Sequence, residues 1–176
     1  MNILLIITGS IAAYKSLDLI RLLKKDGANV NVILTAAGAE FITPLAVTSV
    51  SGNPTYHDMF SPKDESEMGH IRLSREADLV VVAPASADII AKMAHGLASD
   101  LASTCLLASD KPILISPAMN VKMWENKAVQ RNVKQLKSDG VNFIGPEKGE
   151  LACGEKGEGR MSEPEAVYAK IKEILA

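Results

Sequence analysis

Three hydroxyl side chains stand where an apolar run of the sequence ends and a helical pattern begins. They are Ser10, Thr35 and Ser86. Helix N-termini carry unpaired backbone N–H groups and the positive end of the helix dipole, and both favour an anion. The turn at Gly9 and Ser10 therefore suits a phosphate group, although an ordinary strand-to-helix connection accounts for this stretch equally well. Ser10 is also the expected N-cap of the first helix.

The first turn differs from the turn that binds a dinucleotide. A dinucleotide site has three glycines there and an acidic residue at the end of the second strand, where it binds the ribose hydroxyls. Here Gly9 is the one glycine of the turn, and the second apolar run ends in Thr35. Both departures argue against NAD. They favour the single phosphate of a mononucleotide, and FMN is the obvious redox candidate.

A glycine-rich segment near the C-terminus carries two further residues with chemistry, Cys153 and Arg160. The segment spans residues 145–162, with five glycines and no hydrophobic period. It reads either as a surface linker or as a mobile flap that presents a thiol.

The elements that would position these residues alternate along the chain. We expect buried strands over 1–7, 28–34, 78–83, 112–116 and 141–144. We expect helices over 11–25, over 39–50 with an interruption near Pro44, over 70–77, 89–108 and 121–139, and over 163–175 with Ser162 as N-cap. Strands that are apolar throughout indicate burial on both faces, as in a parallel sheet. The alternation predicts one α/β domain over residues 1–176, a three-layer Rossmann-like (flavodoxin-like) doubly wound sheet.

The pattern of the first helix predicts which of its faces is buried. Its apolar residues recur with a period near 3.6, at Ile11, Tyr14, Leu17, Ile20 and Leu23. In the helix predicted over 89–108, the small residues suit close packing between subunits.

The composition bears on several classes of partner. The formal net charge is -2 with no Lys/Arg run, which argues against nucleic acid as the main partner. No apolar run reaches the roughly 18 residues of a membrane helix, and the N-terminal run is expected to be a strand rather than a signal peptide. Cys105 and Cys153 do not suggest a disulfide framework, so a reducing cytoplasm fits best. We expect no metal site.

Four motifs stand in order along the chain, with His70 ahead of the strand at 78–83. They are GSIAAYK (9–15), PASADIIAK (84–92), PAMNVKMW (117–124) and ACGEKGEGRM (152–161). With these motifs the chain resembles, over its whole length, the homo-oligomeric flavin-containing cysteine decarboxylase family. Many relatives read PASANT where this chain, like some bacterial members, has PASAD, so Asp88 replaces the asparagine of the commoner pattern.

The resemblance implies roles for particular residues. FMN would be held by Gly9, Ser10, Ile11, Thr35 and Ser86, with its phosphate at the start of the first helix. His70 would be the active-site histidine, and Cys153 the thiol of a substrate-clamping flap over 145–162. Asn120 would bind the substrate carboxylate and amide, while Met123 and Arg75 would be further substrate-side residues.

The resemblance also implies a reaction. The substrate would be phosphopantothenoylcysteine. FMN would take a hydride from the Cβ of its cysteine, which leaves a thioaldehyde that accepts the electrons released with CO2. An aminoenethiol follows and is reduced again, with Cys153 as the candidate proton donor and His70 moving protons near neutral pH. The family members are trimers or dodecamers with the active site between subunits.

Single residues also have simpler readings: His70 and Asn120 as helix caps, Cys153 as an incidental loop thiol. Two other functions stay open, a decarboxylase acting on a peptidyl cysteine and a non-catalytic FMN-binding regulatory subunit. A flavin prenyltransferase fits less well, because PAMN and the cysteine flap are not expected there.

Overall fold

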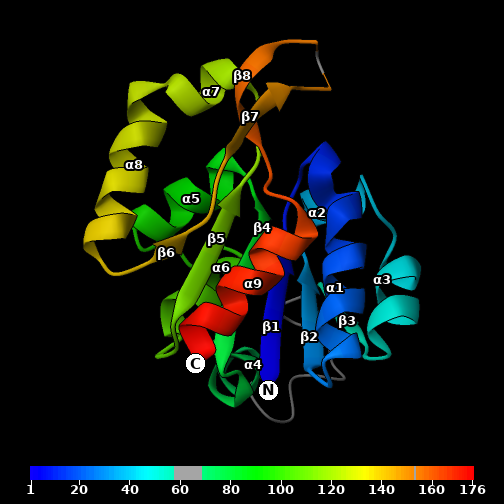
Figure 1. The fold of residues 1–176 in the computed structure, drawn as a ribbon. Coiled ribbons are helices and arrows are strands. Elements are labelled where there is room, and N and C mark those ends of the chain that lie inside the picture. Colours follow the sequence, from blue (N-terminus) through cyan, green and yellow to red (C-terminus); the bar gives the residue numbers. More distant parts are fainter. Residues whose placement is uncertain (58–68, 153) are drawn as a thin grey trace.

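Parallel strands form a central sheet in the order β3-β2-β1-β4-β5-β6 (Figure 1). The computed structural model describes residues 1–57, 69–152 and 154–176, and of residues 69–71 the backbone alone. The strands are β1 (Asn2–Ile7), β2 (Asn29–Leu34), β3 (Thr55–Tyr56), β4 (Leu79–Ala85), β5 (Ile113–Pro117) and β6 (Asn142–Phe143). The strand order reverses between β1 and β4, which is the switch point where doubly wound folds bind ligands. The predicted fold class is confirmed.

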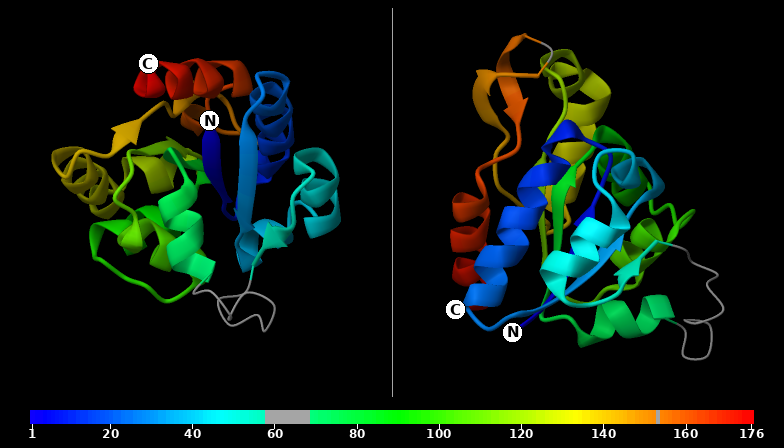
Figure 2. Two further views of the ribbon diagram at one scale, coloured as in Figure 1. Left: turned by 90° about the horizontal axis from the view of Figure 1, so that it is seen from below. Right: turned by 90° about the vertical axis from the view of Figure 1, so that its right-hand side faces the viewer.

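Helices cover both faces of the sheet, as the two views of Figure 2 show. They are η1 (Ile11–Tyr14), α1 (Lys15–Lys25), α2 (Ala36–Ala39), α3 (Pro44–Ser51), α4 (Gly69–Glu76), α5 (Ala87–Ala94), α6 (Leu101–Ala108), α7 (Val121–Glu125), α8 (Lys127–Ser138) and α9 (Pro164–Leu175). Alternate side chains of β1 point to opposite faces. Ile3, Leu5 and Ile7 pack with α1, α3 and α9, whereas Leu4 and Ile6 pack with α4, α5, α6 and α8. No helix in the described parts of the chain is long and apolar enough to span a membrane.

The prediction of a single helix over 89–108 is wrong, because the chain forms the two helices α5 and α6 there. Gly96 ends the first with a positive φ of 65°. Asp100 begins the second with a capping box, in which its side chain accepts from the Ser103 N–H at 2.8 Å. Leu97 lies in the break between the two helices and is 51 % exposed.

Three other predicted helices also start or break elsewhere. The helix predicted over 121–139 divides into α7 and α8 at Asn126, whose side chain caps α8 through the Ala128 N–H at 2.9 Å. Pro44 begins α3 instead of interrupting a helix, since the first turn of a helix needs no N–H from proline. Glu163, not Ser162, is the N-cap of α9; Ser162 is buried and donates to Glu147 Oε1 at 2.7 Å.

The buried face predicted for the first helix is wrong at its start. Ile11 and Tyr14 are 59 % and 56 % exposed, because this turn is the 3₁₀ helix η1 and projects beyond the end of the sheet. The buried positions are instead Ala13 and Ser16, followed by Leu19, Ile20 and Leu23.

The glycine-rich segment forms an antiparallel hairpin in place of an irregular loop. Its strands are β7 (Glu147–Glu150) and β8 (Lys156–Arg160). The hairpin rises above the carboxyl end of the sheet, next to α7 (Figure 1). It therefore stands at the edge where the predicted site residues gather.

Candidate active site

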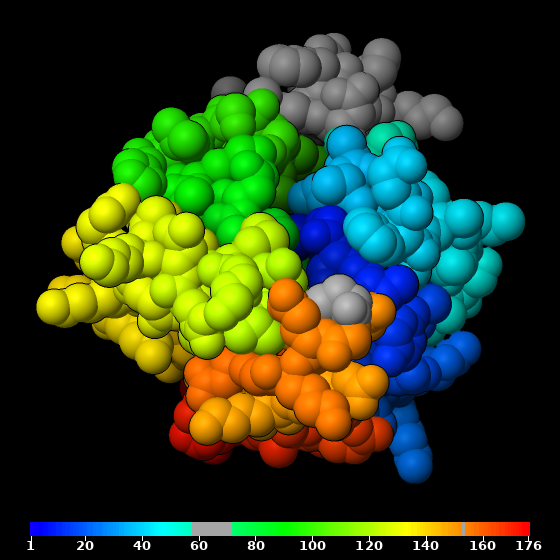
Figure 3. Space-filling view, turned by 90° about the horizontal axis from the view of Figure 1, so that it is seen from above, coloured from blue at the N-terminus to red at the C-terminus, as the bar shows by residue number. Residues whose placement is uncertain are grey.

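Two adjoining cavities open at the carboxyl edge of the sheet, with volumes of about 630 and 450 Å³. Gly9, Ser86, Ala87 and Met123 line both of them. In Figure 3 the blue residues after β1, the yellow-green residues after β5 and the orange hairpin meet on this side of the molecule. The volumes lie in the roughly 300–1,000 Å³ range of sites for small molecules and cofactors.

The three hydroxyls singled out in the sequence all cap helices at this edge. Ser10 Oγ accepts from the Ala12 N–H at 3.2 Å, Thr35 Oγ1 from Gly38 at 3.1 Å, and Ser86 Oγ from Ile89 at 3.4 Å. Ser10 lines the larger cavity, Thr35 the smaller, and Ser86 both. A serine hydroxyl that accepts a capping bond keeps its hydrogen for a ligand, so this edge offers donors to an anion.

Thr8 is a residue that the sequence reasoning missed. Its Oγ1 donates to Pro84 O at 2.8 Å and accepts from the Ser86 N–H at 2.9 Å, and the residue is 2 % exposed. The side chain thus ties the end of β1 to the end of β4 and fixes the position of Ser86. The available signal was the same one used for Thr35, a hydroxyl directly after an apolar strand.

Gly9 is required by packing as well as by its place in the turn. A Cβ at this position would lie 2.6 Å from the Cβ of Ala37 in α2. The glycine therefore lets α2 approach the first turn closely, which brings the Thr35 cap beside the Ser10 cap.

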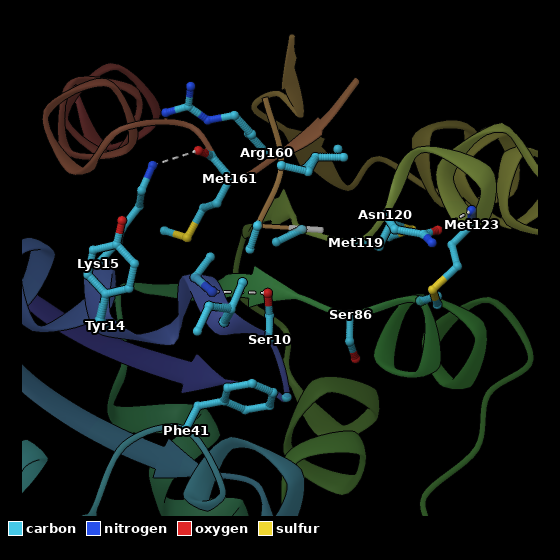
Figure 4. A pocket seen from close by; sticks show the side chains of 18 of the residues that line it. Ser10, Tyr14, Lys15, Phe41, Ser86, Met119, Asn120, Met123, Arg160 and Met161 are labelled. Atoms are coloured by element: carbon cyan, nitrogen blue, oxygen red, sulfur yellow. Dashed lines mark hydrogen bonds between the residues drawn. The ribbon is translucent and has the colours of Figure 1, made fainter. Parts of the chain in front are cut away.

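The larger cavity has an apolar lining that faces its polar caps (Figure 4). Ile11, Phe41, Met119 and Met161 contribute side chains from four separate segments of the chain. Ile11 and Phe41 are exposed, at 59 % and 48 %. Exposed apolar side chains around a concave site suit a flat, largely apolar ring.

Asn120 and Met123 stand on the wall opposite η1 (Figure 4). Asn120 Oδ1 accepts from the Met123 N–H at 2.8 Å and so caps α7. The capping reading of Asn120 is therefore confirmed, and it leaves the NH2 group as the part that can serve a ligand. An amide NH2 is a suitable donor to a carboxylate.

A buried lysine at this edge, Lys15, already has partners. Lys15 Nζ donates to Met161 O at 3.2 Å and pairs with Glu163 at 2.8 Å, while Arg160 reaches the same carboxylate at 3.0 Å. The hydrogen bond from Lys15 holds the pKa of Glu163 below its ordinary value. This cluster fastens the base of the hairpin to the start of α1, and the sequence reasoning did not identify it.

Asp88, where the motif departs from the commoner family pattern, pairs with Lys92 at 3.0 Å beside the smaller cavity. Lys92 also binds Asp100 at 2.7 Å, and this hydrogen bond is the main reason that the pKa of Lys92 is raised. No group of His, Cys, Asp and Glu in the described residues is suited to a metal ion.

Of the other predicted site residues, one lies away from these cavities and two lie outside what the structure describes. Arg75 is an exposed residue of α4, beside the N-terminus at the amino edge of the sheet, and lines neither cavity (Figure 1). His70 belongs to the same helix, but its side chain lies outside the described residues, as does Cys153 altogether. The cavities thus unite Gly9, Ser10, Ile11, Thr35, Ser86, Asn120 and Met123.

The sequence matches the Flavoprotein family over residues 1–176. This chain belongs to that family. It is 47 % identical over 170 residues to the coenzyme A biosynthesis bifunctional protein CoaBC of Haemophilus influenzae, covering 97 % of this chain and 42 % of that protein. With CoaBC of Vibrio vulnificus it shares 50 % identity over 174 residues, 99 % of this chain and 43 % of the relative. The chain therefore spans less than half the length of these relatives.

Solved structures share the fold over almost the whole chain. A cysteine-to-serine mutant of PPC decarboxylase, complexed with pantothenoylaminoethenethiol, superposes with a TM-score of 0.84 at 32 % identity, covering 98 % of this chain and 96 % of the other. The FMN binding protein AtHal3 gives 0.83 at 32 % identity, with 98 % and 95 % covered. The family assigned from the sequence motifs is confirmed.

Proposed function

We propose that this chain is an FMN-dependent decarboxylase that converts 4′-phospho-N-pantothenoylcysteine into 4′-phosphopantetheine in coenzyme A biosynthesis. One observation carries the proposal. Asn120, whose NH2 group can donate to a carboxylate, lines the same cavity as the helix caps Ser10 and Ser86. The relatives named CoaBC and the PPC decarboxylase structure support the same reaction.

The residues present fit FMN. Ser10 and Ser86 supply hydroxyl donors at two helix starts for the phosphate and ribityl oxygens. Thr35, whose hydroxyl donates to Ile7 O at 3.3 Å, supplies an acceptor for a ribityl hydroxyl at a third. The exposed side chains of Ile11 and Phe41 supply an apolar surface for the ring system. When bound, FMN supplies a two-electron acceptor that takes up a hydride equivalent and gives it back within one turnover.

The protein residues bind and orient the substrate and move its protons. The Asn120 NH2 group donates to the substrate carboxylate and holds it until CO2 leaves. Met123, 47 % exposed between the two cavities, packs against the cysteine portion. His70 takes the thiol proton of the substrate, because an imidazole can accept and return a proton near neutral pH. Cys153, within the flap over residues 145–162, gives a proton to the former Cα of the enethiol.

We also propose that the working unit is a homo-oligomer, a trimer or dodecamer, in the cytoplasm. His70 and Arg75 belong to α4 at the amino edge of the sheet, whereas Asn120 lies at the carboxyl edge. A site that uses all three needs α4 from a second copy. The apolar residues Leu97 and Leu107, each more than half exposed, are available for such contacts.

The experiment that tests the function is mass analysis of phosphopantothenoylcysteine after incubation with the FMN-loaded protein. Loss of CO2 alone is expected. Loss of CO2 together with two hydrogens would mean an oxidative decarboxylation that stops at the enethiol, as expected for an enzyme acting on peptidyl cysteine. Bound FMN without any loss of CO2 would contradict the decarboxylase and favour a regulatory FMN-binding protein. A His70→Asn variant should keep its FMN and release no CO2.

A further inference from the structure

The strand β8 of the hairpin lies directly against residues 119–124, the segment that carries Asn120. The Met119 N–H donates to Gly159 O at 3.0 Å. A Cβ at Gly159 would collide with the carbonyl oxygen of Met119, and one at Gly157 would lie 2.9 Å from the methyl groups of Val121. The two glycines therefore let the backbones meet without intervening side chains, on both sides of Asn120.

A side-chain hydrogen bond extends this contact by one helical turn. Trp124 Nε1 donates to Glu158 Oε2 at 3.2 Å. The Trp124 ring is partly buried against the core beneath it. The backbone N–H of Trp124 in turn donates to Asn120 O at 3.0 Å. Trp124 is thus connected both to the hairpin and to the residue that caps α7.

We propose that Trp124 and Glu158 are positioning residues, whose hydrogen bond makes the hairpin and the Asn120 segment move as one body. The orientation of the Asn120 carboxamide then depends on where the hairpin stands. Neither side chain needs to touch the substrate. The effect on catalysis rests on the proposed function, in which Asn120 holds the substrate carboxylate. The mechanical coupling between the hairpin and the Asn120 segment does not depend on that function.

The coupling can be measured without substrate, because Trp124 is the one tryptophan of the chain. In the FMN-loaded protein, Glu158→Ala should shift the emission maximum of Trp124 to longer wavelength and increase its quenching by acrylamide. Lys148→Ala is the matched control, since it removes the 3.7 Å ion pair to Glu158 and leaves the indole bond in place. Glu158→Gln keeps an oxygen acceptor and should behave as the parent protein. Emission and quenching that are the same in Glu158→Ala and Lys148→Ala would overturn the proposal.

The effect on turnover separates positioning from general destabilisation. A hydrogen bond to a charged acceptor that is well shielded from water can change the ratio of coupled to uncoupled conformations about tenfold, and one at the surface changes it less. Glu158→Ala and Trp124→Phe should therefore each raise KM for phosphopantothenoylcysteine about threefold to tenfold. We expect kcat and FMN affinity to change less than about twofold, as for a loss of uniform substrate binding. The double variant should be no worse than either single one.

The possible failures are distinguishable. If the parent protein releases no CO2, the proposed function is wrong, and the fluorescence comparison still decides the coupling. If the parent turns over but Glu158→Ala keeps the parental KM while Trp124 emission shifts, the hairpin does not orient Asn120 and the proposal fails. Additive effects of the two substitutions would also overturn it, because they would show two independent contributions.

Discussion

Replacing Thr8 by Val tests whether one buried hydroxyl holds the ligand edge together. The substitution keeps the shape of the side chain and removes the donor to Pro84 O and the acceptor of the Ser86 N–H. Pro84 O keeps a second donor, the Thr8 N–H at 3.3 Å. The Ser86 N–H, which is partly buried, loses its acceptor, so the main cost is one partly buried donor left without a partner.

The expected loss of stability follows from these contacts. An unsatisfied buried N–H costs about 1–3 kcal/mol, and each lost hydrogen bond contributes about 1 kcal/mol. The added methyl group returns about 0.8 kcal/mol through burial. A net loss of about 2 kcal/mol is expected. In a domain of this size such a loss lowers Tm by roughly 4–8 °C.

The substitution should also weaken FMN binding, because Ser86 is no longer fixed between β1 and β4. The assay is urea denaturation of the FMN-free protein, followed by titration with FMN. Ser16→Ala is the matched control: this buried residue of α1 donates through its Oγ to Ala83 O of β4 at 2.7 Å, and its hydrogen bond does not involve Ser86. Both variants should lose stability, and only Thr8→Val should lose FMN affinity. Equal FMN affinities in the two variants, or a Thr8→Val protein as stable as the parent, would refute the reasoning.

Two further predictions concern ionisable groups. Glu163→Gln should destabilise the protein near pH 7 but not in acid. The hydrogen bond from Lys15 lowers the pKa of Glu163 in the folded protein below the ordinary value of 4.5. The Glu163 carboxylate therefore stabilises the folded state above pH 4.5, and this stabilisation is lost as the pH falls through the folded-state pKa. Urea denaturation of both proteins at several pH values measures this, and a stability difference that persists well below pH 4.5 would contradict it. Burial raises the pKa of the Cys105 thiol to about 12. In a Cys153→Ser variant, Cys105 is the remaining cysteine. Iodoacetamide near pH 8 should therefore leave the folded variant unmodified and should react with it once urea unfolds it. Rapid labelling of the folded variant would show that Cys105 is accessible.

The strands were predicted well because their signal is local and strong. Continuous runs of Ile, Leu and Val fit only a sheet covered on both faces, and β1, β2, β4 and β5 all lie within two residues of their predicted bounds. The helix breaks were predicted poorly. The sequence over 89–108 keeps an apolar pattern through Gly96 and Asp100, and periodicity alone does not register a change of helix direction.

The hairpin shows a second limit of sequence reasoning. Residues 147–160 have neither apolar alternation nor β-branched residues, which are the usual signs of a strand. Their pairing is stabilised by long-range contacts, above all Met119 with Gly159 and Trp124 with Glu158. Such contacts join motifs about 35 residues apart, and no local pattern encodes them.

The sequence by itself determined the chemistry of the site: hydroxyls at strand ends, one glycine in the first turn, and the motifs that identify the family. These features depend on residue type and short-range spacing, which a chain carries whether or not it is folded. Only the tertiary structure decided how they meet. Thr8 fixes Ser86, and Lys15 and Glu163 fasten the hairpin. Helix α4, which carries Arg75, lies at the opposite end of the strands from α7, which Asn120 caps (Figure 1). The reason is physical, since each of these relations joins elements distant in sequence through packing and hydrogen bonds that exist only after the sheet has formed.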